Sequence, residues 1–462
     1  MPCHLLSSLT MIGSPTMFVV LVQICKVAVT FCFCKNNDLP IQYDEDGQYV
    51  VHYEEDKIDA KSMHDEVLPS IKPKPSCHSL SFSRAVDTML RFILLLLPVS
   101  LFAAPFSPDN PWGDYASECL ADKPSLWDEN RIVKEWYTLN LDDDPHDMWR
   151  QVATDYGAKM SAAVGVVKTM LDEFGGPGVW DSVLLLLKDS ADMLTEPYKS
   201  EIHALSDLTG IQLEQLTLLN LFYEISKACT SIVAIDHGGK VIHGRLRLLV
   251  HLELGHSHVG VDENAQFRAV TFAGHLGILT AVRPGKFSLS MNSRFGTSLE
   301  TMTHFFLNGL DPDQQFAVYA CREMLANCET FEEAKDYVES VQLLAGAYFI
   351  MGSTTGGMVN TRAYNGTDHE AFIDTKQQNG WYVLQTNYDW NEKDIYLDDR
   401  TIPGNKCMQQ LGRKRVSLQG IFQVLSSKAN LNKATVYTSV MDVDAGTLYT
   451  FIQDCPDPCW MV

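Results

Sequence analysis

The chain has 462 residues, of which 46% are hydrophobic and 20% are charged. This composition is that of a globular protein, and the length corresponds to about two to four domains, or to one large domain with extensions. The formal net charge is -22 and the isoelectric point about 5.0, which argues against nucleic-acid binding because that activity requires clustered lysine and arginine.

The first 88 residues show no pattern that would form a core. Phe18 to Cys34 is an apolar run interrupted by Lys26, and residues 36–76 are polar and acidic. Such a composition favours disorder. We therefore interpret residues 1–88 as an extension that precedes the natural start at Met89, with a membrane anchor at 18–34 as the alternative.

Residues 89–104 have the features of a secretory signal peptide. A short basic start is followed by the apolar run Phe92 to Phe102 and by the small residues Ala103 and Ala104. The run is shorter than the about 20 residues that span a membrane. A buried strand or helix is the alternative interpretation.

The segment 105–228 is predicted to be mainly helical after a loop-like start at 105–130. Apolar residues recur at helical spacing from Trp149 to Leu171, and Gly175-Gly-Pro177 ends that helix. Further helices are predicted at about 180–194, 197–208 and 211–227. The apolar surface of these helices either packs internally or contacts lipid.

At Cys229 the pattern changes from helix to strand. Cys229 to Asp236, the turn 237–239 and Lys240 to Arg245 predict a β-hairpin. Strands are predicted at 269–273, 277–282, 286–291, 347–351, 358–364 and 381–387, and helices within 299–341. This order predicts an α+β fold with sheet packed on sheet and helices outside.

Twelve cysteines are present, and seven of them follow residue 88. These seven are Cys119, Cys229, Cys321, Cys328, Cys407, Cys455 and Cys459. An odd number leaves at least one thiol unpaired in an oxidising compartment, and Cys229 is our choice. It is a buried structural cysteine, half of a disulfide, or a nucleophile whose base is a neighbouring histidine or its own α-amine.

Three shorter signals follow Cys229. Cys455 and Cys459 are close enough for a metal site or a local disulfide, and the absence of a second such pair favours the disulfide. Cys321 and Cys328 lie on a predicted helix and are expected to be core thiols. Asn365-Gly-Thr367 is a glycosylation acceptor. We predict neither a metal nor a cofactor.

Several stretches together carry a resemblance to a known family. They are Trp136-Tyr-Thr-Leu-Asn-Leu-Asp142, Asn220-Leu-Phe-Tyr-Glu224, Cys229-Thr-Ser-Ile-Val-Ala234, Ile242-His-Gly-Arg245, Phe287-Ser-Leu-Ser-Met-Asn292, Trp381-Tyr-Val-Leu-Gln-Thr-Asn-Tyr-Asp389, Leu397-Asp-Asp-Arg400 and Asp454-Cys-Pro-Asp-Pro-Cys459. In them the chain resembles the acid ceramidase family, whose close relative is N-acylethanolamine acid amidase. The resemblance implies the αββα sandwich of N-terminal-nucleophile hydrolases.

The resemblance also implies a maturation and a set of site residues. Cleavage before Cys229 would produce an α chain of about 105–228 and a β chain of 229–462, joined as a heterodimer by a disulfide between Cys119 and Cys407. Cys229 would be the nucleophile and its new amine the base. Arg245 and Arg400 match active-site arginines, with ion-pair partners at strand ends as the alternative. Asn387 matches an asparagine that helps to hold the oxyanion, with a turn or cap residue as the alternative.

The implied activity is hydrolysis of ceramide to sphingosine and a fatty acid in the lysosome, with secretion as a further destination. The partners implied are the lipid substrate, the lysosomal membrane surface and a saposin-type activator. Chemically, a free amine can accept the thiol proton, arginine charge favours the thiolate, and each oxyanion donor is worth roughly 3–4 kcal/mol.

The sequence departs from the family directly after Arg245. The family continues there with a segment that contains a catalytic aspartate and then with a long loop. Here Arg245 runs into Leu246 to Glu253, which resembles the strand beyond that loop, and neither Asp236 nor Glu253 is a credible substitute. Two alternatives to ceramide hydrolysis remain: hydrolysis of other N-acyl lipids such as N-acylethanolamines, and a non-catalytic lipid-binding role.

Overall fold

The computed structural model describes residues 118–176, 178–225, 229–248, 256–259, 266–294, 305, 313–394, 398–433, 435–455 and 459. The predicted extension 1–88, the predicted signal peptide 89–104 and Glu253 lie outside these residues. Among the described helices, none combines the length and the apolar character needed to cross a membrane.

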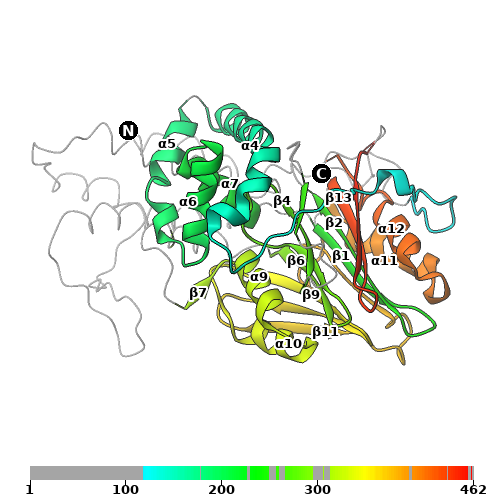
Figure 1. Cartoon of the computed structure of the whole chain (residues 1–462). Helices are drawn as coiled ribbons and strands as arrows, with labels where there is room; N and C mark the ends of the chain where they lie inside the picture. The colour runs from blue at the N-terminus through cyan, green and yellow to red at the C-terminus, as the bar shows by residue number, and fades with distance from the viewer. Residues whose placement is uncertain are drawn as a thin grey trace, which may run out of the picture. The chain divides into compact units, whose positions relative to one another are not determined.

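The segment before Cys229 is helical, as predicted (Figure 1). Its helices are α4 Pro145–Gly175, α5 Val179–Leu186, α6 Tyr198–Thr209 and α7 Leu213–Ile225. Helix α4 begins where the Asp144 carboxylate accepts a hydrogen bond from the backbone N–H of His146, and Pro145 occupies the first turn. Its predicted apolar stripe, from Trp149 to Leu171, is buried.

Five antiparallel strands form the first sheet, in the order β12-β1-β2-β13-β14. Their bounds are β1 Cys229–Ile235, β2 Val241–Leu248, β12 Tyr382–Gln385, β13 Thr435–Asp442 and β14 Thr447–Ile452. The predicted hairpin is confirmed as β1 and β2. Ser231 lies opposite Arg245 on one side and opposite Gln385 on the other, so β1 separates the strand of Arg245 from the strand that leads to Asn387.

Seven antiparallel strands form the second sheet, in the order β11-β10-β9-β6-β5-β4-β3. Their bounds are β3 His256–Val259, β4 Arg268–Phe272, β5 Thr280–Arg283, β6 Phe287–Ser293, β9 Ala347–Ser353, β10 Gly357–Arg362 and β11 Thr367–Phe372. The short strands β7 Gln314–Gln315 and β8 Gln342–Leu343 pair in parallel beside it.

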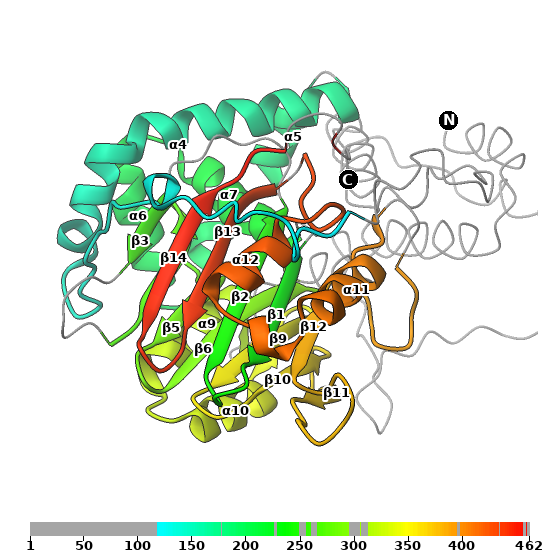
Figure 2. The same ribbon diagram turned by 90° about the vertical axis from the view of Figure 1, so that its right-hand side faces the viewer.

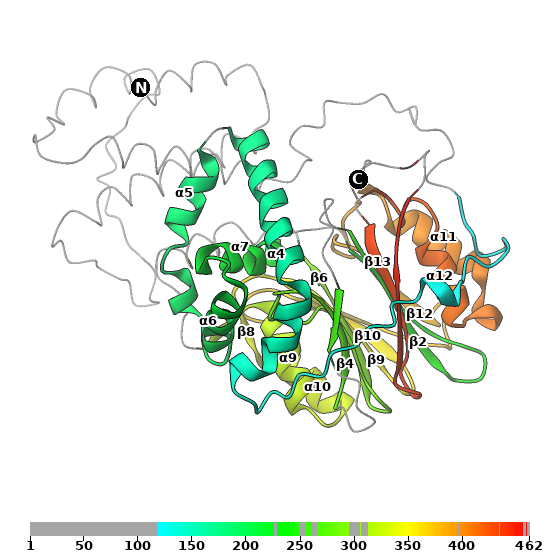
Figure 3. The same ribbon diagram turned by 45° about the horizontal axis from the view of Figure 1, so that its top comes forward.

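The two sheets face each other, and helices lie on their outer faces (Figure 3). Strands β1 and β2 contact β6 and β9 across the interface. Helices α11 Thr401–Leu411 and α12 Leu418–Leu425 cover the first sheet, whereas α9 Ala317–Asn327 and α10 Phe331–Ser340 contact the second. The predicted α+β class is confirmed as a mixture of helices with antiparallel sheets, in which helices contact both sheets.

An extended segment near the start of the described residues runs along β14 (Figure 2). The N–H of Val133 donates to the carbonyl of Thr450 at 2.9 Å, and Ile132 forms a bridge with Phe451. Upstream, the Trp127 ring makes edge contacts with Phe451, and Cys119 is bonded to Cys407 on α11. Residues before Cys229 are therefore attached both covalently and by hydrogen bonds to residues after it.

Gly244 permits the close approach of α12 to β2. A Cβ atom at this position would lie 2.4 Å from Ile421 Cγ2 and 2.8 Å from Leu425 Cδ1. We expect Gly244→Ala to lower the free energy of unfolding by about 1–3 kcal/mol, measured by urea denaturation, because α12 has to move. Gly165→Ala is the control, since nothing lies within 4 Å of its Cβ position. Equal midpoints for Gly244→Ala and wild type would contradict the prediction.

Candidate active site around Cys229

Cys229 is the first residue of β1 and is 2% exposed. Helix α7 ends at Ile225, and residues 226–228 lie outside the described part. The predicted change from helix to strand at this cysteine is thus present. The thiol takes part in no disulfide, which removes that alternative for Cys229.

Arg245 brings a positive charge to the sulfur. Its Nη2 donates to Cys229 Sγ at 3.3 Å, and its Nη1 donates to the carbonyl of Leu279. The side chain is fully buried, its Nε has no hydrogen-bond partner, and no carboxylate of the described residues forms an ion pair with it. A guanidinium therefore lies within hydrogen-bond distance of the sulfur.

Asn387 and Arg400 contact the backbone of Cys229. The backbone N–H of Cys229 donates to Asn387 Oδ1 at 2.6 Å, and Arg400 Nη2 donates to the same oxygen at 3.0 Å. Arg400 Nη1 also donates to the carbonyl oxygen of Cys229. The structure therefore brings together all four residues that the sequence singled out, so that the nitrogen, sulfur and carbonyl oxygen of Cys229 each have a partner.

Asp398 holds Arg400 and was not among the predicted site residues. Arg400 Nε and Nη2 donate to the two Asp398 carboxylate oxygens, each at 2.7 Å, and Tyr388 donates to Oδ2 at 3.0 Å. Burial alone would lower the pKa of Arg400, but the Asp398 carboxylate outweighs it and holds the pKa above the usual value. A signal was present in the sequence, because an acid two residues before a predicted active-site arginine can form an ion pair with it.

A buried polar chain runs from β1 into the second sheet. Ser290 Oγ donates to Ser231 Oγ at 2.9 Å, and Ser231 Oγ donates to Asn292 Oδ1 at 2.9 Å. His243 lies between Ser288 and Ser290, with each ring nitrogen 2.8 Å from a serine oxygen.

His243 is a poor candidate for the base. Burial, together with the charge of Arg245, lowers the pKa of His243 to about 3. A histidine that remains neutral at such a low pH accepts a proton weakly. No histidine of the described residues is hydrogen-bonded to Cys229.

Strand β2 extends beyond its predicted end at Arg245. Residues 246–248 continue it without a break, so Arg245 runs directly into the segment that follows it in the sequence. Asp236 lies in the β1–β2 turn, where its carboxylate accepts from the N–H groups of Gly238 and Lys240. Its distance along β1 from Cys229 explains why it takes no part in the site.

The other cysteines and the acceptor asparagine lie outside this site. The structure contains the Cys119–Cys407 and Cys455–Cys459 disulfides, and the second of these uses the sulfurs that a metal would have required. Cys321 and Cys328 are buried and belong to neither bond. Asn365 is exposed in the turn between β10 and β11.

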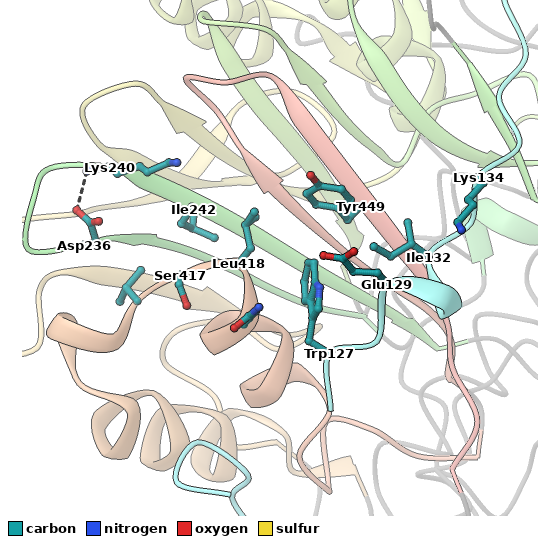
Figure 4. A pocket seen from close by; sticks show the side chains of 12 residues that line it. Trp127, Glu129, Ile132, Lys134, Asp236, Lys240, Ile242, Ser417, Leu418 and Tyr449 are labelled. Carbon is teal, nitrogen blue, oxygen red and sulfur yellow. Dashed lines mark hydrogen bonds between the residues drawn. The ribbon is translucent and has the colours of Figure 1, made fainter. Parts of the chain in front are cut away.

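A groove of about 630 Å³ lies on the outer face of the first sheet (Figure 4). It opens between the extended segment at Trp127 to Lys134, the turn at Asp236 to Lys240, and the start of α12. None of its lining residues is Cys229, Arg245, Asn387 or Arg400. The groove is therefore separate from the cysteine site.

Comparison with known proteins gives consistent matches. The probable acid ceramidase of Caenorhabditis elegans is 34% identical over 81% of this chain and 98% of its own length. The acid ceramidases of Homo sapiens and Heterocephalus glaber are each 32% identical over about four fifths of this chain and 97–98% of their own lengths. The solved structure of the C. elegans N-acylethanolamine-hydrolyzing acid amidase ortholog is 27% identical, covers 49% of this chain and 100% of its own, and has a TM-score of 0.43.

A family model also matches part of the chain. It is described as the beta subunit of N-acylethanolamine-hydrolyzing acid amidase and matches residues 135–194. This segment lies before Cys229, in the part that we assign to an α chain, so the subunit letter in that description differs from ours.

Proposed function

The chain belongs to the acid ceramidase family, and on this premise we propose that it is an amidase that hydrolyses ceramide to sphingosine and a free fatty acid. The observation that carries the proposal is the convergence of Arg245, Asn387 and Arg400 on the sulfur, nitrogen and carbonyl oxygen of Cys229. Relatives named acid ceramidase match over nearly their whole length, which supports the substrate class.

We also propose that the chain matures by cleavage of the Ala228–Cys229 bond. The parts would be an extension at 1–88, a signal peptide at 89–104, an α chain at 105–228 and a β chain at 229–462. The position of Cys229 at the start of β1 supports this division, since a new amine there would remain next to Asn387 Oδ1. The Cys119–Cys407 disulfide would hold the two chains together as a heterodimer.

The proposed mechanism uses the new α-amine of Cys229 as the base. The amine takes the thiol proton, Arg245 stabilises the thiolate, and the sulfur attacks the amide carbonyl of the lipid. One N–H of the Asn387 side-chain amide donates to the carbonyl oxygen of Ser293 at 2.7 Å. The second N–H would donate to the oxyanion. Sphingosine leaves with the proton, and water then releases the fatty acid from Cys229.

The arrangement of the layers supports an assignment to the αββα sandwich of N-terminal-nucleophile hydrolases. In that assignment α11 and α12 form one outer layer, and α9 and α10 form the other. The lysosome is the proposed location, with secretion as a second destination. A lysosomal membrane surface and a saposin-type activator are the proposed partners that would present the lipid.

Each of the two alternatives to ceramide hydrolysis is supported by one observation. The name of the matching family model favours N-acylethanolamines as substrates. The absence of a carboxylate partner for Arg245 among the described residues favours a non-catalytic lipid-binding role, because the family's aspartate would supply one.

Turnover of two lipids by the purified full chain separates these functions. At acid pH we expect ceramide to be hydrolysed faster than an N-acylethanolamine, and intact mass to show a fragment that begins at Cys229. Faster turnover of the N-acylethanolamine would favour the second substrate class. An uncleaved chain that binds ceramide vesicles but hydrolyses neither lipid would overturn the proposed catalysis.

A further inference from the structure

The end of β6 holds the segment that carries Asn387. Asn292 Nδ2 donates to the carbonyl oxygens of Gln385 at 2.9 Å and Thr386 at 3.0 Å, directly before Asn387. The next residue, Ser293, accepts a hydrogen bond from Asn387 Nδ2 through its own carbonyl. These contacts fix Asn387 and the two residues that precede it.

Arg294 follows Ser293 in the sequence. It fixes the chain on the other side of Asn387 through an ion pair with Asp389. Its Nε donates to Asp389 Oδ1 at 2.9 Å and its Nη2 to Oδ2 at 2.5 Å, so the pair is bidentate. Tyr348 donates to Asp389 Oδ1 at 2.6 Å, and Asp368 accepts from Arg294 Nη1. The side chains of Arg294 and Asp389 are only 12% and 17% exposed, so solvent screens the pair less than it screens a surface pair.

The position of Asn387 between these two anchors connects them with the chemistry. Asn387 Oδ1 has to meet both the nitrogen of Cys229 and the guanidinium of Arg400. Small displacements of such a group reduce the rate strongly, because its interaction depends on distance and direction. We propose that the Arg294–Asp389 ion pair positions Asn387 against Cys229, and thereby sets the rate of amide cleavage without contacting the substrate; the proposal rests on the proposed function.

The pair is suited to acid conditions. Burial alone would raise the pKa of Asp389, but its bonds to Arg294 and Tyr348 and the charge of His369 outweigh burial and hold the pKa below the usual value. The ionised carboxylate therefore stabilises the fold above its unfolded pKa of about 3.9, and this contribution is lost as the pH falls through the lower folded value. The titratable and charged groups that surround Asp389 are Arg294, Tyr348, Asp368, His369 and Glu392.

Asp389→Asn in the full chain tests the proposal with two readouts. We expect kcat for ceramide to fall by roughly 10- to 100-fold with KM unchanged, because Asn387 acts on the transition state and not on substrate binding. We also expect faster hydrogen exchange in residues 385–390, whereas wild type keeps its protection down to about pH 4. Arg294→Lys, which keeps the charge but loses the bidentate geometry, should show a smaller decrease.

Glu329→Gln is the matched control. Glu329 pairs with Arg283 at 2.6 Å, and Arg283 lies opposite Phe287, at the end of β6 remote from Arg294. We expect this variant to keep the wild-type kcat and the wild-type exchange in residues 385–390. An equal decrease of kcat in both variants would show general destabilisation and overturn the positioning role.

The two readouts separate failure of this proposal from failure of the proposed function. If the wild-type chain hydrolyses no amide, the proposed function fails, and hydrogen exchange still tests the ion pair. Unchanged exchange in residues 385–390 of Asp389→Asn overturns the positioning role whatever the activity. If Asp389→Asn does not fold, Arg294→Lys provides the same comparison.

Discussion

Cys229→Ala is expected to abolish both cleavage before residue 229 and amide hydrolysis. The sulfur is the only atom of Cys229 that the proposed mechanism uses to attack, and Arg245 contacts it directly. Loss of a nucleophile lowers kcat by roughly 10⁶-fold in enzymes that form covalent intermediates. Intact mass measures the cleavage, and release of fatty acid from ceramide measures the hydrolysis.

Cys328→Ala is the control for this substitution. Cys328 is also buried and also outside the disulfides, so the variant removes another buried thiol without touching Arg245. We expect it to be cleaved and active. Separate α and β chains in Cys229→Ala would mean that another protease cuts the chain, and residual hydrolysis in that variant would exclude Cys229 as the nucleophile.

Glu201→Gln is expected to cause the largest loss of stability. Arg322 donates to the two Glu201 carboxylate oxygens at 2.6 and 2.7 Å, and Trp149 donates to Oε2 at 3.0 Å. Burial alone would lower the pKa of Arg322, but Glu201 more than offsets it and raises the pKa. Removing one charge of such a buried pair costs about 3–5 kcal/mol, which guanidinium denaturation would measure.

The Glu201–Arg322 ion pair joins residues on the two sides of the proposed cleavage site. Glu201 is on α6, before Cys229, and Arg322 is on α9, after it, so the pair holds the proposed α and β chains together beside the disulfide. Lys168→Gln removes the exposed Lys168–Asp172 pair and should cost less than about 1 kcal/mol. A double replacement of Glu201 and Arg322 by leucine should recover much of the loss. A cost below 1 kcal/mol for Glu201→Gln would contradict the expectation.

Local patterns predict some elements of this fold much better than others. The apolar spacing from Trp149 to Leu171 and the glycines after it predict α4, and the turn at 237–239 predicts the β1–β2 hairpin, since both depend on neighbours in sequence. The sequence pattern led to no prediction for α11, α12, β13 or β14. Strand β13 pairs with β2 from a distant part of the chain, and such pairing is decided by packing of the whole sheet.

The sequence by itself determined the thiol at the start of a strand, its hairpin partner Arg245 and, through the family resemblance, the expectation that Asn387 and Arg400 act with Cys229. The tertiary structure decided how these groups meet, because Asn387 and Arg400 reach Cys229 across 158 and 171 residues of chain. It also revealed the bonds of Asp398 to Arg400 and of Arg294 to Asp389. Such contacts depend on strand order and register, and periodicity along one segment carries no information about either.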